Sequence, residues 1–364
     1  MSLLRLDITH FRNLASVKID LTASGFHFFY GCNASGKTSL LEAIYYLSRG
    51  RSFRSSSVGH IINHLAPKFS LFAQIQTNDQ QVVPVGVERQ RDGTMRVRVA
   101  ARDKSSIGEL LELAPLLLIN SNSFNLLDAG PVFRRKYLDW SAFYLAPDFL
   151  PVWKTYERVL KQRNTALRER RPSKELEIWS AELIKSATSL DAIRRNVIAQ
   201  LLPFLQSTLL ELIDIPGLEL AYYPGWDDSL TYQDAMARWG DRDVYAGHTQ
   251  LGPHRADFKI SINQIPVKDI LSRGQQKLFI CAMIIGQGAM LHEYANRKPI
   301  YLMDDLPSEL DHHSRSRLMR LLEKQTAQVF VTAVEREAWV DSCQTPIKMF
   351  HVEHNDVREE NWEQ

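Results

Sequence analysis

The stretch Phe26-His-Phe-Phe-Tyr30-Gly31-Cys32-Asn33-Ala34-Ser35-Gly36-Lys37-Thr38 decides the fold of this chain. Its first five residues form an apolar run that predicts a buried strand, and the apolar residues between positions 40 and 47 recur at helical spacing. The residues between them match the pattern G-x-x-x-x-G-K-[ST], which requires a strand before it and a helix after it. Both the pattern and its context therefore predict a phosphate-binding loop.

Each position of this loop has a chemical reason. The backbone N–H groups of residues 31–38 curl around a phosphate chain, and the helix that follows adds positive partial charge at its N-terminus. We expect Lys37 to reach the β- and γ-phosphates of a nucleotide and Thr38 to place its hydroxyl on Mg²⁺. The alternative, a glycine turn without a ligand, leaves this combination of residues unexplained.

A second apolar strand, residues 299–303, ends in two acids, Asp304 and Asp305. Open α/β sheets bind their ligands at the carboxyl ends of strands. We therefore expect Asp304 to hold Mg²⁺ through its water shell, and Asp305 to orient or deprotonate an attacking water. Asp305 and Lys37 are the predicted catalytic residues. On its own, a strand ending in two solvated acids would be the simpler interpretation.

The organisation of the chain follows from changes in hydrophobic period. Alternating residues predict strands at 4–19 and 68–99, a helical stripe follows from about residue 131, and short strands return near residues 258, 299 and 329. The predicted fold class is α/β, a P-loop NTPase. Residues 1–120 and 299–364 are predicted to form a discontinuous α/β lobe I, and residues 121–298 a mainly helical lobe II.

Composition excludes several classes of protein. The 364 residues carry a net charge of only +2, so any nucleic-acid contact must come from a local basic face. Three widely spaced cysteines make a disulfide framework or a zinc site a poor interpretation and fit a reducing compartment. No apolar run is long enough to span a bilayer, and the N-terminus lacks a signal core, so we expect a cytoplasmic protein without a membrane partner.

Three further segments resemble elements of ABC-type ATPases. Leu271-Ser272-Arg273-Gly274-Gln275-Gln276 resembles the signature motif, which implies contact with a nucleotide bound by the opposite protomer, although Arg273 stands where glycine is usual. Ser308 and Asp311 lie where the D-loop lies in this class. Thr332 occupies the position of the switch residue, which is histidine in transporters. The Q-loop region, residues 119–122, offers asparagines and no glutamine.

The most specific resemblance is to the RecF family. It is carried by Phe11-Arg-Asn-Leu14, Gly50-Arg-Ser-Phe-Arg54, Gln162-Arg-Asn164 and Gly252-Pro-His-Arg-Ala-Asp257, and it spans nearly the whole chain. The related SMC-type heads need hundreds more residues for their coiled coils. The resemblance therefore implies an ABC-type ATPase head with a helical second lobe and no coiled-coil arm.

The RecF resemblance also implies a function. Such proteins bind ATP and Mg²⁺, dimerise with ATP, hydrolyse ATP weakly and bind gapped DNA or single-strand/double-strand junctions, where RecO and RecR help them load RecA. Two mechanisms stay open: hydrolysis reopens the dimer, or ATP binding alone holds a DNA-bound scaffold and turnover is incidental. A third possibility, a transporter subunit, is disfavoured by the helical insertion and by the absence of a switch histidine.

Two basic clusters are candidates for DNA contact. Lys161, Arg163 and Arg168 fall in one predicted helix, and Arg134 and Arg135 adjoin each other in another. Either cluster is equally compatible with a solvated helix face.

Overall fold

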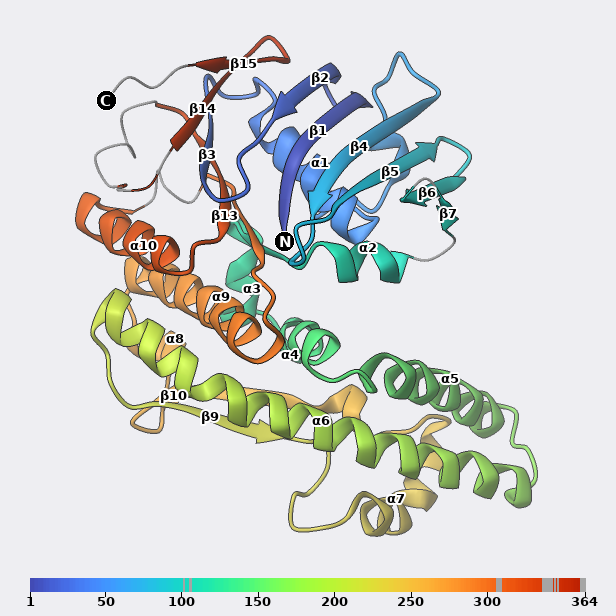
Figure 1. The fold of residues 1–364 in the computed structure, drawn as a ribbon. Helices are drawn as coiled ribbons and strands as arrows, with labels where there is room; N and C mark the ends of the chain where they lie inside the picture. Colours follow the sequence, from blue (N-terminus) through green and yellow to red (C-terminus); the bar gives the residue numbers. More distant parts are fainter. Residues whose placement is uncertain are drawn as a thin grey trace. The chain divides into compact units, whose positions relative to one another are not determined.

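The computed structural model describes residues 1–100, 102–104, 107–305, 310–335, 343, 345 and 347–360. The chain forms two compact units (Figure 1). Unit 1 comprises Met1–Ser123, Glu211–Ile213 and Lys277–Gln364, and unit 2 comprises Phe124–Leu210 and Asp214–Gln276. The predicted α/β fold with a helical insertion is confirmed by this architecture.

Unit 1 contains an antiparallel sheet of order β2-β1-β4-β5-β6-β7. The chain opens with an antiparallel pair of strands, β1 and β2, in the region where the sequence predicted strands. Strand β4 shows the alternation that builds this sheet: Phe69, Leu71, Ala73 and Ile75 point inward along it, and all four are buried. The strands are β1 (Ser2–Phe11), β2 (Leu14–Asp20), β4 (Lys68–Gln76), β5 (Val82–Gln90), β6 (Met95–Val99) and β7 (Arg102–Lys104).

The second sheet of unit 1 has the order β15-β14-β3-β13-β12-β8, and all its pairings are parallel except the one at the β15 edge. Its central strands are buried on both faces, which explains their continuous apolar runs. The strands are β3 (Gly25–Tyr30), β8 (Leu116–Ile119), β12 (Ile300–Met303), β13 (Gln328–Ala333), β14 (Ile347–Glu353) and β15 (Asp356–Glu360).

Helix α1 (Lys37–Arg49) shares one apolar core with side chains of both sheets. It ends at Gly50, whose φ of 61° is left-handed and whose N–H donates to the Tyr46 carbonyl at 2.8 Å. Unit 1 also contains η1 (Val58–His60), α2 (Ile107–Leu113), α10 (His312–Lys324) and most of α9 (Arg273–Ala295). Segment η2 (Ser121–Phe124) lies where the first unit ends.

Unit 2 is mainly helical and has one small antiparallel sheet of order β11-β10-β9. Helix α4 starts at Pro131, which needs no hydrogen-bonded N–H in the first turn. Helix α7 is capped by Thr231, whose hydroxyl accepts from the Asp234 N–H at 3.1 Å. The strands are β9 (Leu218–Tyr223), β10 (Asp257–Ile262) and β11 (Ile265–Pro266). The helical segments are α3 (Asn125–Asp128), α4 (Pro131–Leu145), α5 (Phe149–Arg168), α6 (Ser173–Ile213), α7 (Tyr232–Ala246), η3 (Pro253–Arg255) and α8 (Val267–Ile270).

The boundary between the two units lies near the start of helix α9 (Arg273–Ala295), not after that helix as the sequence predicted. The sequence placed residues up to 298 in lobe II, whereas the units divide after Gln276. Gly288 packs so closely on β12 that a Cβ there would lie 1.9 Å from the Tyr301 hydroxyl, and the Gln325 amide donates to the Ile285 carbonyl at 3.1 Å. Most of α9 therefore belongs to the core of unit 1.

Helices α6 and α9 are long and apolar enough to cross a membrane by length and composition alone. The most apolar window of α9 is 72% buried, as expected of a core helix. The corresponding window of α6 is 39% buried, and its buried stripe includes Leu183, Leu190 and Leu201. Two such helices are weak support for a membrane protein, because core helices of soluble proteins pass the same test.

Candidate nucleotide site

The phosphate loop turns sharply between β3 and α1, where the sequence placed it. Gly31 has a φ of 144°, and a Cβ there would lie 2.2 Å from the Val352 carbonyl oxygen. Gly36 has a φ of 120°. Only glycine tolerates both backbone conformations without strain, so these two positions are required by the loop itself.

Lys37 lies inside the curl of the loop and is buried. Its ammonium donates to the carbonyls of Gly31 at 2.7 Å and Cys32 at 2.8 Å. Burial lowers the pKa of Lys37 from its ordinary value, although the nearby charges of Asp305, Cys32 and Asp304 oppose the shift. Part of the hydration of this ammonium has thus been removed, which favours a charged phosphate partner.

Asp304 receives two hydroxyl hydrogen bonds. Thr38 donates to its Oδ1 at 2.9 Å, and Thr332 donates to the same oxygen at 3.0 Å. Thr332 also accepts from the Asp305 N–H at 2.9 Å. Burial raises the pKa of Asp304, the two hydroxyl donors oppose that shift, and Asp305 adds to it.

The topology explains why residues so distant in sequence meet. Strand β13 pairs in parallel with β3 on one side and with β12 on the other. The loop after β3, the acids after β12 and Thr332 near the end of β13 therefore lie at one edge of the sheet. Asn33, Ala34, Gly36, Lys37, Thr38, Asp305 and Thr332 line one cavity of about 1040 Å³. The cavity is large enough for a nucleotide.

The site fits Mg²⁺ in the form that accompanies a nucleotide. The Thr38 hydroxyl and the Asp304 carboxylate are oxygen donors within hydrogen-bond distance of each other, and Mg²⁺ prefers oxygen ligands that include substrate phosphates and water. Among the residues that the structure describes, no group of three or more His, Cys, Asp or Glu side chains could hold a metal unaided. A cation bound here would neutralise charge on the phosphates.

The same cavity contains residues to which the sequence analysis gave no role. Arg12 and Arg54 line it, together with Asn13, His60, His64 and Asn355. Arg12 donates to both oxygens of Glu42, at 3.0 and 2.6 Å, and Glu42 is fully buried on α1. Ser52 also hydrogen-bonds Glu42, and Arg54 lies 3.8 Å from it. An acid within the apolar stripe of α1 was the available signal, because buried carboxylates need basic partners.

The signature residues of unit 2 are exposed. Ser272 and Gln275 form a reciprocal capping box at the start of α9, in which the Ser272 hydroxyl accepts from the Gln275 N–H at 3.3 Å and Gln275 Oε1 accepts from the Ser272 N–H at 3.0 Å. Arg273 is 77% exposed and lies 3.5 Å from Asp128. No described residue outside the helix would lie within 4 Å of a Cβ at Gly274, so packing among the described residues does not require glycine there.

Of the two residues predicted to form the D-loop, the structure describes only Asp311. Ser308 lies outside the described residues. Asp311 caps α10 and accepts from the N–H and hydroxyl of Ser314 at 2.9 and 2.8 Å. These hydrogen bonds lower the pKa of Asp311, the backbone donor most. A structural role accounts for the contacts that Asp311 makes.

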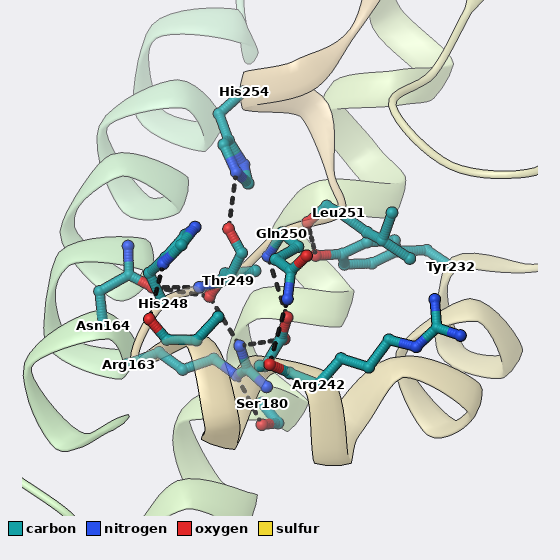
Figure 2. Close-up of polar contacts among 12 residues, drawn as sticks. Arg163, Asn164, Ser180, Tyr232, Arg242, His248, Thr249, Gln250, Leu251 and His254 are labelled. Atoms are coloured by element: carbon teal, nitrogen blue, oxygen red, sulfur yellow. Dashed lines mark hydrogen bonds and ion pairs between the residues drawn. The ribbon is translucent and has the colours of Figure 1, made fainter. Parts of the chain in front are cut away.

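The DNA-contact prediction at Arg163 is wrong. The side chain is 3% exposed and pairs with Asp243 at 2.8 Å, and it also donates to Thr249 at 2.6 Å and Ser180 at 3.0 Å. Figure 2 shows its guanidinium enclosed between Ser180 and Thr249. Its donors are used within unit 2. Arg163 therefore holds α5, α6 and α7 together.

The other predicted DNA contacts differ in exposure. Arg134 binds Asp257 through two hydrogen bonds, at 2.6 and 3.0 Å, and is 15% exposed, so it too is a structural residue. Arg135 is partly buried and donates to the Ala256 carbonyl at 2.7 Å. Lys161 and Arg168 are exposed on α5 and stay candidates.

Comparison with known proteins agrees with this geometry. Residues 2–358 match the family described as RecF/RecN/SMC N terminal domain. The chain is 41% identical over 363 residues to the DNA replication and repair protein RecF of Pseudomonas putida strain GB-1, with 98% of each chain covered. It is also 41% identical to the RecF of Cellvibrio japonicus, over 98% of this chain and 99% of the relative.

The chain belongs to the RecF family.

Solved structures confirm the fold. A structure described as the recombination mediator protein RecF-ATP in the RecFOR pathway superposes with a TM-score of 0.86 at 26% identity, covering 99% of this chain and 98% of the other. An Smc head bound to a domain of ScpA gives a TM-score of 0.62 at 13% identity, which shows a shared fold only. The fold is that of an ABC-type ATPase head, and RecF-family membership places the protein among ATP-binding proteins of DNA replication and repair.

Proposed function

We propose that this protein is an ATP-dependent DNA-binding protein of recombinational repair and replication. ATP and Mg²⁺ bind the cavity of unit 1, two chains close around gapped DNA or a single-strand/double-strand junction, and slow hydrolysis reopens them. In the cytoplasm it acts with RecO and RecR to load RecA. The RecFOR pathway named for the ATP-bound relative supports RecO and RecR as partners.

One observation carries the nucleotide part of the proposal. Lys37, Thr38, Asp304, Asp305 and Thr332 come from three adjacent strand ends and meet at one site. In this arrangement Lys37 and the loop amides bind the β- and γ-phosphates, and Thr38 and Asp304 hold Mg²⁺. Asp305 orients the attacking water. Asp305 is one methylene shorter than glutamate, which accounts for slow turnover.

The dimer part rests on unit 2. The signature residues Ser272 and Gly274 are exposed, and no described residue outside the helix would lie within 4 Å of a Cβ at Gly274. A phosphate held by another copy could approach the N-terminus of α9 there, where the Ser272 hydroxyl and the amides of the first turn would meet it. A composite site of this kind links ATP binding to dimer closure.

Sedimentation of the pure protein tests the three claims together. Runs with ATP alone, gapped DNA alone, and both together are compared with a run without ligand. We expect a dimer with ATP and a larger DNA-bound species with both. A monomer under all four conditions would contradict the proposal.

The variant Asp305→Asn distinguishes the scaffold mechanism from the mechanism in which hydrolysis releases the dimer. If hydrolysis drives release, this variant stays dimeric on DNA and does not restore damage tolerance to cells that lack the protein. If tolerance survives while turnover is lost, ATP binding alone suffices, and the scaffold mechanism replaces the hydrolytic one.

A further inference from the structure

The segment Gly252–Asp257 has no role in the ATP site, although it is among the segments specific to the RecF resemblance. Within unit 2 this segment forms the single 3-10 turn η3 (Pro253–Arg255), which directly precedes β10. Arg255 is exposed, and the structure gives its side chain no hydrogen bond or ion pair among the described residues. Any contact of this arginine with DNA rests on the proposed DNA binding.

The backbone that carries Arg255 is braced on both sides. Arg194 donates to the Pro253 carbonyl at 2.7 Å, and Arg135 donates to the Ala256 carbonyl at 2.7 Å. Two buried or partly buried guanidinium groups thus hold the residues that flank His254 and Arg255. Arg255 therefore projects from a fixed turn and loses little backbone entropy when it binds.

The side chain of His254 provides a third contact that holds the same turn. The Tyr156 hydroxyl lies 2.6 Å from its Nδ1, and its Nε2 lies 3.2 Å from the Thr249 carbonyl, a contact drawn in Figure 2. Burial lowers the pKa of His254 to about 4, and the charges of Arg255 and Arg135 contribute. The imidazole is therefore neutral at pH 7 and adds no charge to the turn.

The carboxylates near this turn are already engaged. Asp139 binds Arg194 through two hydrogen bonds, at 2.9 and 3.0 Å. Asp257 binds Arg134 in the same two-point manner. Each acid has its own arginine, so neither is available as the ion-pair partner of another one.

Arg135 and Arg255 therefore carry positive charge without a carboxylate of their own. Burial lowers the pKa of Arg135, and the neighbouring charge of Arg194 lowers it further, which opposes the pull of Asp139 and Asp257. Arg255 contributes to the same lowering. Four arginines thus share two acids, which leaves a local excess of two positive charges that an anion would stabilise.

We propose that Arg255 binds a phosphate of the DNA backbone, and that the positive charge of Arg135 strengthens the attraction for that phosphate. A guanidinium presents paired N–H donors that match phosphate oxygens, and most protein–DNA hydrogen bonds go to the backbone. Lys136, next to Arg135 on α4, is exposed, and its ammonium lies 5.4 Å from the Phe133 ring centroid. This exposed aromatic–cation pair is of the kind that single strands contact.

Fluorescence anisotropy with a labelled gapped duplex, at saturating ATP and several salt concentrations, tests this inference. The variant is Arg255→Gln. The matched control is Arg171→Gln, because Arg171 is also an arginine of unit 2 but already pairs with Glu169 and Glu175. We expect Arg255→Gln to weaken binding about tenfold and to reduce the slope of log K against log salt by about one, and Arg171→Gln to change neither.

Two additional measurements show whether weaker binding by Arg255→Gln comes from the lost charge or from a loss of folding. Arg255→Lys keeps the charge and should recover most of the affinity, and Arg255→Gln should melt at the wild-type temperature because the side chain is exposed. Arg255→Gln with wild-type affinity and salt slope would overturn the inference. Loss of ATP-driven dimerisation without DNA would also overturn it, since the phosphate would then belong to a nucleotide. If the wild type itself binds no gapped DNA, the proposed function fails first.

Discussion

The cavity of unit 1 and the network around Arg163 in unit 2 are both built from charged and hydroxyl side chains, yet they differ in what remains unsatisfied. Arg163 finds Asp243, Thr249 and Ser180 within its own unit. Among the described residues, the Lys37 ammonium donates to two loop carbonyls, and burial lowers its pKa. The first cluster is complete without a ligand, whereas the second holds charge that a ligand would stabilise.

The partners of a buried arginine or lysine indicate whether its role is structural or functional. A buried charge that has a carboxylate and further hydrogen bonds contributes structure, and removing one partner leaves the other uncompensated. A partly desolvated charge that faces a cavity and has only weak partners is available for function. Arg255 is exposed and, unlike Arg163, has no ion-pair partner among the described residues, whereas Arg134 pairs with Asp257 and belongs with Arg163.

The largest expected effect is on stability. Arg163→Met leaves the Asp243 carboxylate buried without its partner, and we expect the free energy of unfolding to fall by about 3–5 kcal/mol. Urea unfolding followed by far-UV circular dichroism and tryptophan fluorescence measures it. Arg168→Met, on the exposed side of the same helix, should change it by less than about 0.5 kcal/mol. Equal small changes in both variants would remove the distinction between the two arginines.

Next in size is the loss of nucleotide affinity in Lys37→Met. Loop amides alone cannot neutralise the β- and γ-phosphates, so we expect ATP affinity to fall by at least about 100-fold, which corresponds to roughly 2.7 kcal/mol. Titration with a fluorescent ATP analogue measures it. Cys32→Ser is the control, because Cys32 contributes a carbonyl and its side chain is exposed. Normal affinity in a folded Lys37→Met variant would contradict the assignment of the loop.

A smaller effect is expected for Asp304→Asn, which should stabilise the protein where Arg163→Met destabilises it. Burial raises its pKa, so the folded protein without nucleotide holds the proton more tightly than the unfolded chain does. The resulting stability is present below the unfolded pKa and is lost as the pH rises through the folded pKa. Asp304→Asn should therefore raise the melting temperature at pH 7, by about 2–4 °C for each kcal/mol regained.

Thermal scans in EDTA from pH 8 down to pH 4.5 check this prediction. The difference between Asp304→Asn and wild type should narrow as the pH falls. Asp311→Asn provides the opposite case, because hydrogen bonds from Ser314 lower the pKa of Asp311 and its charge favours folding at pH 7. A lower melting temperature for Asp304→Asn would show that its carboxylate is structural.

The sequence was sufficient where one local pattern contains the whole reason for a structure. The glycines, Lys37 and Thr38 lie within eight residues, and their strand–loop–helix context is equally local. The sequence was insufficient where a side chain binds a partner that is distant along the chain. Nothing near Arg163 points to Asp243, 80 residues away, and the charge run around Arg163 looked like an exposed face. The boundary in α9 failed because close packing at Gly288 depends on Tyr301, which hydropathy does not show.

The central claim is that the cavity of unit 1 is an incomplete ATP site, completed by the signature of a second copy. Mixing Lys37→Met with Ser272→Arg tests it most directly, because each variant alone should be inactive. Mixed dimers contain one site with an intact phosphate loop and an intact signature, so ATPase activity should reappear and peak near equal amounts, at up to about a quarter of wild type. Full activity from Ser272→Arg alone, at dilutions where it is monomeric, would contradict the claim.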